Sequence, residues 1–248
     1  MSQATRLPVF RSLNALNSTI AACGKCPRLV AYRAEVARVK RRAFREQTYW
    51  GRPVPGWGDP RAWLWVVGLA PAAHGANRTG RMFTGDGSST WLVRAMYRAG
   101  FASQPTSLHR DDGLRLLGAY ITATVRCAPP QNKPTPSEVA RCLPFFDREV
   151  ALLRRVRVLL ALGRVGFETC RRLLRARGAD VRAMRFAHAA TYAPGPSLPT
   201  LIASYHPSRQ NTNTGRLTEE MLDQVFDAAR RALAEGAPVR GGTALEVH

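Results

Sequence analysis

Five cysteines supply the side chains whose spacing is most typical of a metal site. Cys23 and Cys26 are separated by two residues, so both thiols can reach one metal centre. Cys127 follows an apolar run and Cys142 lies early in a predicted helix, so these two can supply the other ligands. Cys170 has apolar neighbours and is expected to be a small core residue. The alternative for all of them is simple burial.

Four thiolates can hold zinc or a [4Fe–4S] cluster. Cys127 and Cys142 are widely separated in sequence, and no histidine lies at zinc-ligand spacing from either pair of cysteines. Both features favour the cluster, with zinc as the alternative.

Three polar loops contain a second group of reactive side chains, namely Asp86, Asn132 and His206. The loops are rich in Gly, Pro and polar residues and span 70–87, 128–134 and 205–215. Each follows an apolar run that is predicted to be a strand. Ligands of open parallel sheets bind in the crevice at the carboxyl ends of the strands. Three such loops are therefore expected to build one site.

Four apolar runs bounded by turn residues are predicted to be the buried strands that position these loops, at 62–69, 117–125, 156–162 and 200–204. A weaker run, 186–192, is a candidate edge strand. Helical patterns alternate with the strands at 88–98, 135–153, 164–177 and 218–235. Alternating strands and helices predict an α/β domain with a mostly parallel sheet covered on both faces.

Helix-start signals are clearest at residue 135, where Thr135 can cap the helix, Pro136 suits its first position and Glu138 can complete a capping box. The segment before residue 57 is expected to form a helical pair that packs on the domain. We expect one domain over residues 1–236, followed by a flexible Gly/Pro-containing tail at 237–248.

The chain is strongly basic, with 37 Lys and Arg residues against 17 acidic ones and a net charge of +20. This excess favours nucleic acid as a partner, although Arg-rich usage can also reflect a GC-rich genome. A basic run before the first strand is either a DNA-facing patch or a solvated helix face; it comprises Arg38, Lys40, Arg41, Arg42 and Arg45. No run is apolar enough to span a bilayer, and residues 1–11 lack a signal-peptide core. We therefore expect a cytoplasmic protein with reduced cysteines and no membrane partner.

Taken together, three segments make the chain resemble the family 5 uracil-DNA glycosylases, the UDGb type. They are residues 68–87, 125–134 and 205–211, with the cysteines in the matching order. The resemblance implies a three-layer α/β/α Rossmann-like uracil-DNA glycosylase fold with an iron–sulfur cluster. It also implies that the [4Fe–4S] cluster is structural and is held by Cys23, Cys26, Cys127 and Cys142.

Two positions depart from related families. Leu69 stands where many uracil glycosylases have an acidic or amide residue that handles the attacking water, and Ala123 stands where family 4 enzymes have a uracil-reading Asn. Both departures agree with family 5. They imply a roomier pocket that accepts deaminated purines, hypoxanthine or xanthine, as well as uracil.

The resemblance implies base flipping and hydrolysis of the N-glycosidic bond. Cleavage builds positive charge on the sugar and negative charge on the base. Asp86 is expected to orient the water or to stabilise the sugar cation, although it can also be a helix N-cap. His206 is expected to donate a hydrogen bond to a base oxygen as a neutral imidazole, and Asn132 to read the base or place the water. Phe83 is expected to stack on the base. A structural role is the alternative for each of them.

Weaker expectations concern the remaining loop residues. His74 and Asn77 are expected to line the pocket, the backbone N–H groups of Ala70 and Ala72 to contact the base, and Arg209 to contact a phosphate or the vacated stack. The expected partner is DNA that contains uracil or another deaminated base, bound by a monomer at the nucleoid. Lys133 is the only lysine of the three loops, which favours a glycosylase without lyase activity. A non-catalytic nucleic-acid-binding module and a covalently trapping relative are the alternatives.

Overall fold

A central sheet organises the computed structural model, which describes residues 7–235. Within that range six strands follow the order β1-β3-β2-β4-β6-β5. The four inner strands are parallel, as predicted. Their bounds are β2 (Leu64–Gly68), β3 (Ala119–Ala123), β4 (Val158–Leu162) and β6 (Thr200–Ser204). All four lie within the apolar runs of the sequence, and β6 has the predicted bounds.

Two short antiparallel strands form the edges of the sheet. β1 (Trp57–Gly58) pairs with β3 and was not predicted, because two residues carry no periodic pattern. The predicted edge strand 186–192 is wrong in length, because only β5 (Thr191–Tyr192) pairs with β6. Ala189 has a left-handed backbone, φ 59°, which an extended strand cannot contain.

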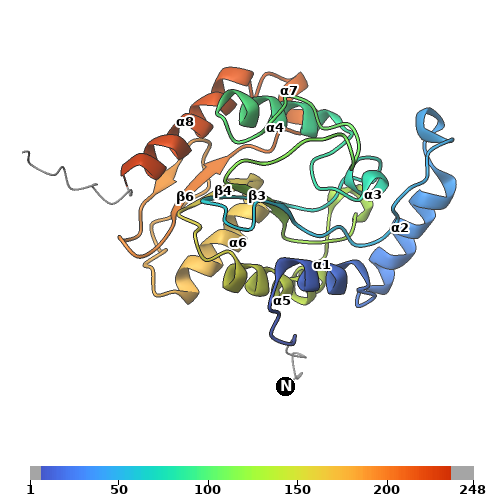
Figure 1. The fold of residues 1–248 in the computed structure, drawn as a ribbon, viewed down its shortest axis with the longest axis horizontal. Helices are drawn as coiled ribbons and strands as arrows, with labels where there is room; N and C mark the ends of the chain where they lie inside the picture. Colours follow the sequence, from blue (N-terminus) through green and yellow to red (C-terminus); the bar gives the residue numbers. More distant parts are fainter. Residues whose placement is uncertain (1–6, 236–248) are drawn as a thin grey trace, which may run out of the picture.

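Helices cover both faces of this sheet, so the described part has the three-layer α/β/α arrangement (Figure 1). α4 and α8 lie on one face, and α5 and α6 on the other. The α-helices are α1 (Leu13–Ala21), α2 (Pro27–Val39), α3 (Ala76–Thr79), α4 (Gly87–Arg98), α5 (Pro136–Leu152), α6 (Gly163–Ala176), α7 (Arg209–Asn213) and α8 (Glu219–Glu235). Two 3₁₀ turns occur at Arg42–Phe44 and Pro130–Asn132.

Alternation along each strand sends neighbouring side chains to opposite layers. In β2, Leu64 and Val66 belong to the core beneath α4 and α8. Trp65 and Val67 belong to the core beneath α5 and α6, where the Trp65 ring stacks on Phe146 with ring centroids 4.5 Å apart. Two-sided burial of this kind explains why the inner strands read as continuous apolar runs.

Local signals fixed the helix starts as predicted. α5 begins with a capping box in which Thr135 and Glu138 each accept a hydrogen bond from the other's backbone N–H. The N-terminal helical pair is α1 and α2, and α1 packs on α5 through Leu16, Ile20 and Phe145. No helix in the described range is long and apolar enough to cross a membrane. The predicted tail at 237–248 lies outside the described residues.

Candidate active site

A cavity of about 670 Å³ opens at the carboxyl ends of β2, β3 and β6, where the three polar loops meet. Seven residues predicted for the site line it, and they come from all three loops. These residues are Ala70, Ala72, His74, Asp86, Asn132, His206 and Arg209. The parallel strands therefore bring the loops together as the sheet topology requires.

Asp86 has two roles in the geometry of this cavity. It is the N-cap of α4, where its Oδ1 accepts a hydrogen bond from the Ser89 backbone N–H at 2.8 Å. It also lines the cavity wall. Burial raises the pKa of its carboxyl group, while the N–H groups of Ser89 and Ser88 and the charges of Arg78 and Arg209 oppose the rise. The capping alternative is therefore correct as a description: Oδ1 makes the capping hydrogen bond, and Oδ2 lies beside Gly75.

His206 follows β6 and lines the same cavity. Burial lowers the pKa of its imidazole from its ordinary value to about 4, so the ring is neutral near pH 7. Phe83 does not line the cavity in this structure. Its ring lies beside His206, with ring centroids 5.7 Å apart and planes inclined by 30°, and it packs on the main core.

Asn132 lies at the end of a 3₁₀ turn with an unusual backbone. Gln131 and Asn132 have φ values of 54° and 58°, a left-handed conformation that asparagine tolerates better than most residues. Both side chains are exposed and both residues line the cavity. The turn thus presents an amide donor and acceptor at the cavity rim.

His74 is held by a partner that the sequence did not reveal. Its Nδ1 lies 3.0 Å from the hydroxyl of Tyr49, a buried residue of the N-terminal segment. Burial lowers the pKa of His74, and the charges of Arg41 and Arg78 lower it further.

The expectation that Asn77 lines the pocket is wrong. Asn77 lies in α3 with its side chain completely buried, and its Nδ2 donates to the backbone oxygens of Arg33 and Ala73. These bonds join α3 to α2. A polar residue in a Gly-rich loop gives no sign in the sequence of which way its side chain points, so only packing places it.

Three cavity residues were missed because they lie far from the loops in sequence. Tyr32 comes from α2, and Arg41 and Phe44 come from the segment at and before the first 3₁₀ turn. The basic run was the one signal that pointed to this region. Within it, Arg38 pairs with Glu35 and Lys40 donates to the Arg45 backbone oxygen, whereas Arg41 lines the cavity.

Three of the four cysteines predicted to bind metal lie in one cluster, whereas Cys23 packs against a separate cluster that includes residues of α1. Cys26, Cys127 and Cys142 share one buried cluster, and the charges of Cys142, Cys23 and Cys26 act on Cys127, whose pKa burial raises to about 12. In residues 7–235, no three Cys, His, Asp or Glu side chains converge as the ligands of one ion do. Cys170 lies apart, buried in the core under α6.

Two arginines supply positive charge beside these thiols. Arg33 is almost completely buried, and its Nε and Nη1 have no hydrogen-bond partner among the described residues. The charge of Arg33 acts on Cys127, and that of Arg126 acts on Cys142. A buried guanidinium with unpaired N–H groups is costly, so the donor set fits a group that carries negative charge.

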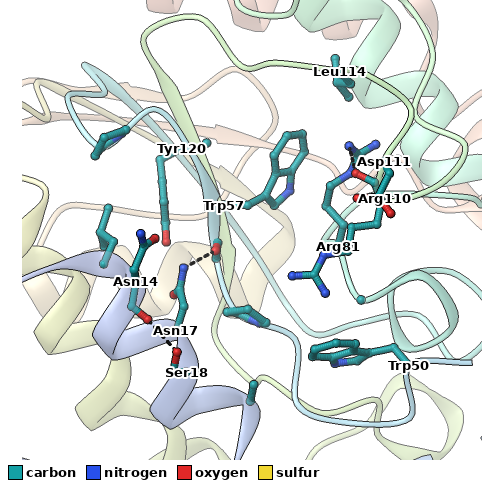
Figure 2. Close-up of a pocket in the computed structure, with 17 residues that line it drawn as sticks. Asn14, Asn17, Ser18, Trp50, Trp57, Arg81, Arg110, Asp111, Leu114 and Tyr120 are labelled. Carbon is teal, nitrogen blue, oxygen red and sulfur yellow. Dashed lines mark hydrogen bonds between the residues drawn. The ribbon is translucent and has the colours of Figure 1, made fainter.

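A second cavity of about 600 Å³ lies along the β1 edge of the sheet and contains none of the predicted site residues. In Figure 2, Asn17 and Tyr120 lie on one side of it and Trp50 and Arg81 on the other. The Asn17 amide donates to the Gly56 carbonyl, and the Trp57 indole N–H donates to the Met82 carbonyl. The acid and imidazole groups that catalysis would use are in the first cavity.

The chain is similar to known proteins over most of its length. The family model of the uracil DNA glycosylase superfamily matches residues 55–230. A type-5 uracil-DNA glycosylase of Thermus thermophilus is 54% identical over 213 residues, which cover 86% of this chain and 94% of the relative. One from Mycobacterium tuberculosis is 50% identical, covering 89% and 81%. One from Pyrobaculum aerophilum is 46% identical, covering 86% and 88%.

Proposed function

The chain belongs to the uracil-DNA glycosylase superfamily, and from this membership we propose that it removes uracil from DNA by hydrolysis of the N-glycosidic bond. The type-5 relatives support uracil excision in particular. One observation carries the assignment of the site. Asp86 and His206, which lie far apart in sequence, line the same cavity at the ends of parallel strands. A carboxylate and a neutral imidazole are the groups that this reaction needs.

Asp86 acts on the sugar side of the scissile bond. Cleavage develops positive charge on the sugar, and a carboxylate in a partly dry cavity stabilises such charge more strongly than one in water. The hydrogen bond from Ser89 fixes the carboxylate through Oδ1. The other oxygen orients the attacking water, so that one group serves both tasks.

His206 acts on the base side. The departing base gains negative charge on its carbonyl oxygens, and a hydrogen bond to that oxygen strengthens as the charge grows. Because the imidazole is neutral near pH 7, it donates a hydrogen bond without transferring a full proton. Asn132 and the backbone N–H groups of Ala70 and Ala72 complete the contacts to the base.

The cavity also supports a broad substrate range. Leu69 lines it and offers no hydrogen bond to distinguish one base from another. His74 also lines the cavity, and Phe83, whose ring lies beside His206, is proposed to stack on a base that enters. We therefore propose that hypoxanthine and xanthine are substrates as well as uracil, with Arg209 contacting the backbone or the vacated stack.

The enzyme is proposed to leave an intact abasic site. Within the described part of the chain no lysine lines the cavity, and Lys133 is an exposed residue outside its lining. A lyase needs an amine nucleophile at the sugar. The working form is proposed to be a monomer bound to DNA at the nucleoid.

A single-turnover assay on a duplex with one uracil tests the reaction. The wild-type chain is expected to release uracil and to yield strand breaks only after alkali, and Asp86→Asn is expected to bind the same duplex but to lose most of the rate. Near-normal cleavage by Asp86→Asn would remove Asp86 from the mechanism. Tight binding without release of any deaminated base would favour the non-catalytic alternative, and an adduct that survives denaturation would favour covalent trapping.

We also propose that Cys23, Cys26, Cys127 and Cys142 hold a [4Fe–4S] cluster. The buried Arg33, whose Nε and Nη1 have no partner among the described residues, suits its negative charge. One zinc ion would need four sulfurs within about 2.3 Å of a single point, whereas a cluster spreads the thiolates over four irons. The cluster would have a structural role: Ala70 packs on the cysteines and lines the cavity, so the cluster would support the cavity wall.

Anaerobic purification with iron and sulfide assays and a visible spectrum tests the cluster. Cys127→Ser and Cys142→Ser are expected to lose iron and stability, whereas the matched control Cys170→Ser is expected to keep the iron. Stoichiometric zinc in place of iron and sulfide would reject the cluster and leave the glycosylase assignment standing.

A further inference from the structure

Arg78 is a buried cation that the reaction described above does not use. It belongs to the short helix α3 between the two halves of the first loop, and its side chain is 7% exposed. Its hydrogen-bond acceptors among the described residues are two backbone carbonyls and an amide oxygen, and none is a carboxylate. Burial of an unpaired charge is expensive, so the contacts that compensate for it reveal what the residue does.

The guanidinium joins the two backbone stretches that carry His74 and Asp86. Its Nε donates to the His74 carbonyl at 2.8 Å, and its Nη2 donates to the Gly85 carbonyl at 2.7 Å. Gly85 immediately precedes Asp86. A planar guanidinium fixes both the distance and the angle between its acceptors, so it sets the separation of His74 and Asp86.

The third side of the guanidinium reaches the outer wall of the cavity. Its Nη1 donates to Gln47 Oε1 at 2.5 Å, and its Cζ lies 3.9 Å from the centroid of the Phe44 ring. Phe44 lines the cavity. Arg78 therefore connects a wall built by the N-terminal segment with both halves of the catalytic loop.

The charge of Arg78 also acts on Asp86. Burial disfavours the ionised carboxylate, and Arg78 and Arg209 are the two arginines whose charges oppose that effect. Arg209 is exposed on α7 and is free to turn toward a DNA phosphate. Arg78 cannot turn away, because three acceptors hold it.

We propose that Arg78 is a positioning residue for base excision, which fixes the loop backbone at His74 and Gly85 and supplies a permanent positive charge beside Asp86. The inference rests on the proposed role of Asp86 in the reaction. It assigns Arg78 no contact with the substrate.

Single-turnover excision on a uracil duplex, measured from about pH 5 to about pH 9, tests this inference with Arg78→Gln and Arg78→Lys. Arg78→Gln is expected to lower the rate about 100-fold, as displacement of a catalytic group does. The acid limb of its pH–rate profile should also move to higher pH by about one unit, because the ionised Asp86 carboxylate loses a stabilising positive charge. Arg78→Lys keeps the charge, so its rate should fall while its acid limb stays near that of the wild type.

Binding to a duplex with a non-cleavable 2′-fluoro-deoxyuridine separates positioning from affinity. The Kd is expected to change less than about twofold, since Arg78 does not touch DNA. The inference is overturned if the acid limbs of both variants coincide with that of the wild type, or if weaker binding accounts for the whole loss of rate. Asp86→Asn in the same assay tests the proposed role of Asp86 separately. Full activity of Asp86→Asn would reject the role of Asp86. If Asp86→Asn is inactive while the acid limb of Arg78→Gln coincides with that of the wild type, only the role of Arg78 is rejected.

Gln47→Glu provides a second route if the Arg78 variants do not fold. Gln47 is exposed, so the substitution leaves the core intact, and its new carboxylate would neutralise the Arg78 guanidinium. The acid limb is expected to move to higher pH in Gln47→Glu and to stay in place in the matched control Gln47→Ala. Coincident limbs in these two variants would overturn the inference.

Discussion

The Asp86 carboxylate occupies the space that a side chain at Gly75 would need. A Cβ added to Gly75 would lie 1.9 Å from Asp86 Oδ2 and 2.8 Å from its Cγ. The other oxygen is held by the Ser89 N–H at 2.8 Å. The carboxylate is thus enclosed between a helix start and a glycine, and its position depends on both.

Gly75→Ala should therefore displace the carboxylate and lower the single-turnover excision rate, by about 100-fold if the shift approaches 1 Å. Gly87→Ala is the matched control, because a Cβ there meets its nearest neighbour, Arg209, at an ordinary 3.5 Å. The measurement is the rate of uracil release at saturating enzyme. Equal rates in the two variants would show that Asp86 tolerates displacement.

The pH dependence of the free energy of unfolding should reveal the protonation of His206. Burial lowers its pKa from 6.5 to about 4, so between these values the unfolded chain binds a proton that the native chain does not. The free energy of unfolding therefore falls as the pH falls from about 6.5 to about 4, with a slope of up to about 1.36 kcal/mol per pH unit from this group. Urea unfolding across that range should show a shallower decline in His206→Asn, and parallel curves would contradict the buried neutral imidazole.

The ion pair between Arg126 and Glu149 should govern stability, because both side chains are almost completely buried, at 1% and 0% exposure. Glu149→Ala leaves the guanidinium unpaired and is expected to cost about 3–5 kcal/mol of unfolding free energy. Asp180→Ala breaks the exposed pair with Arg182 and is expected to have no measurable effect. The midpoints of urea unfolding of Glu149→Ala and Asp180→Ala test this difference, and similar midpoints would refute the prediction.

The salt dependence of DNA binding should locate the phosphate contacts. Arg41 and Arg209 line the cavity and form no ion pair within the described residues. Replacing both with alanine is expected to weaken binding on all sequences alike and to reduce the slope of log K against log salt by about 2. Arg182→Ala, which removes an exposed arginine paired with Asp180, should leave the slope unchanged. An unaltered slope in the double variant would place the phosphate contacts elsewhere.

The sequence by itself determined the layers and the place of the site. The inner strands are readable because both of their faces are buried, which leaves continuous apolar runs such as 158–162. Helix α5 is readable because Thr135 and Glu138 cap each other locally. Once the strands are parallel, the loops with Asp86, Asn132 and His206 must meet at one edge of the sheet.

Only the tertiary structure decided which side chains face the cavity and what holds them. Asn77 turns inward to α2, and Arg41 and Phe44 arrive from a segment that precedes every inner strand. Arg78 gains its partner Gln47 through a contact between residues 31 positions apart, which no local pattern records. Periodicity and capping reflect interactions between near neighbours in sequence, whereas these contacts exist only after the N-terminal segment has packed on the sheet.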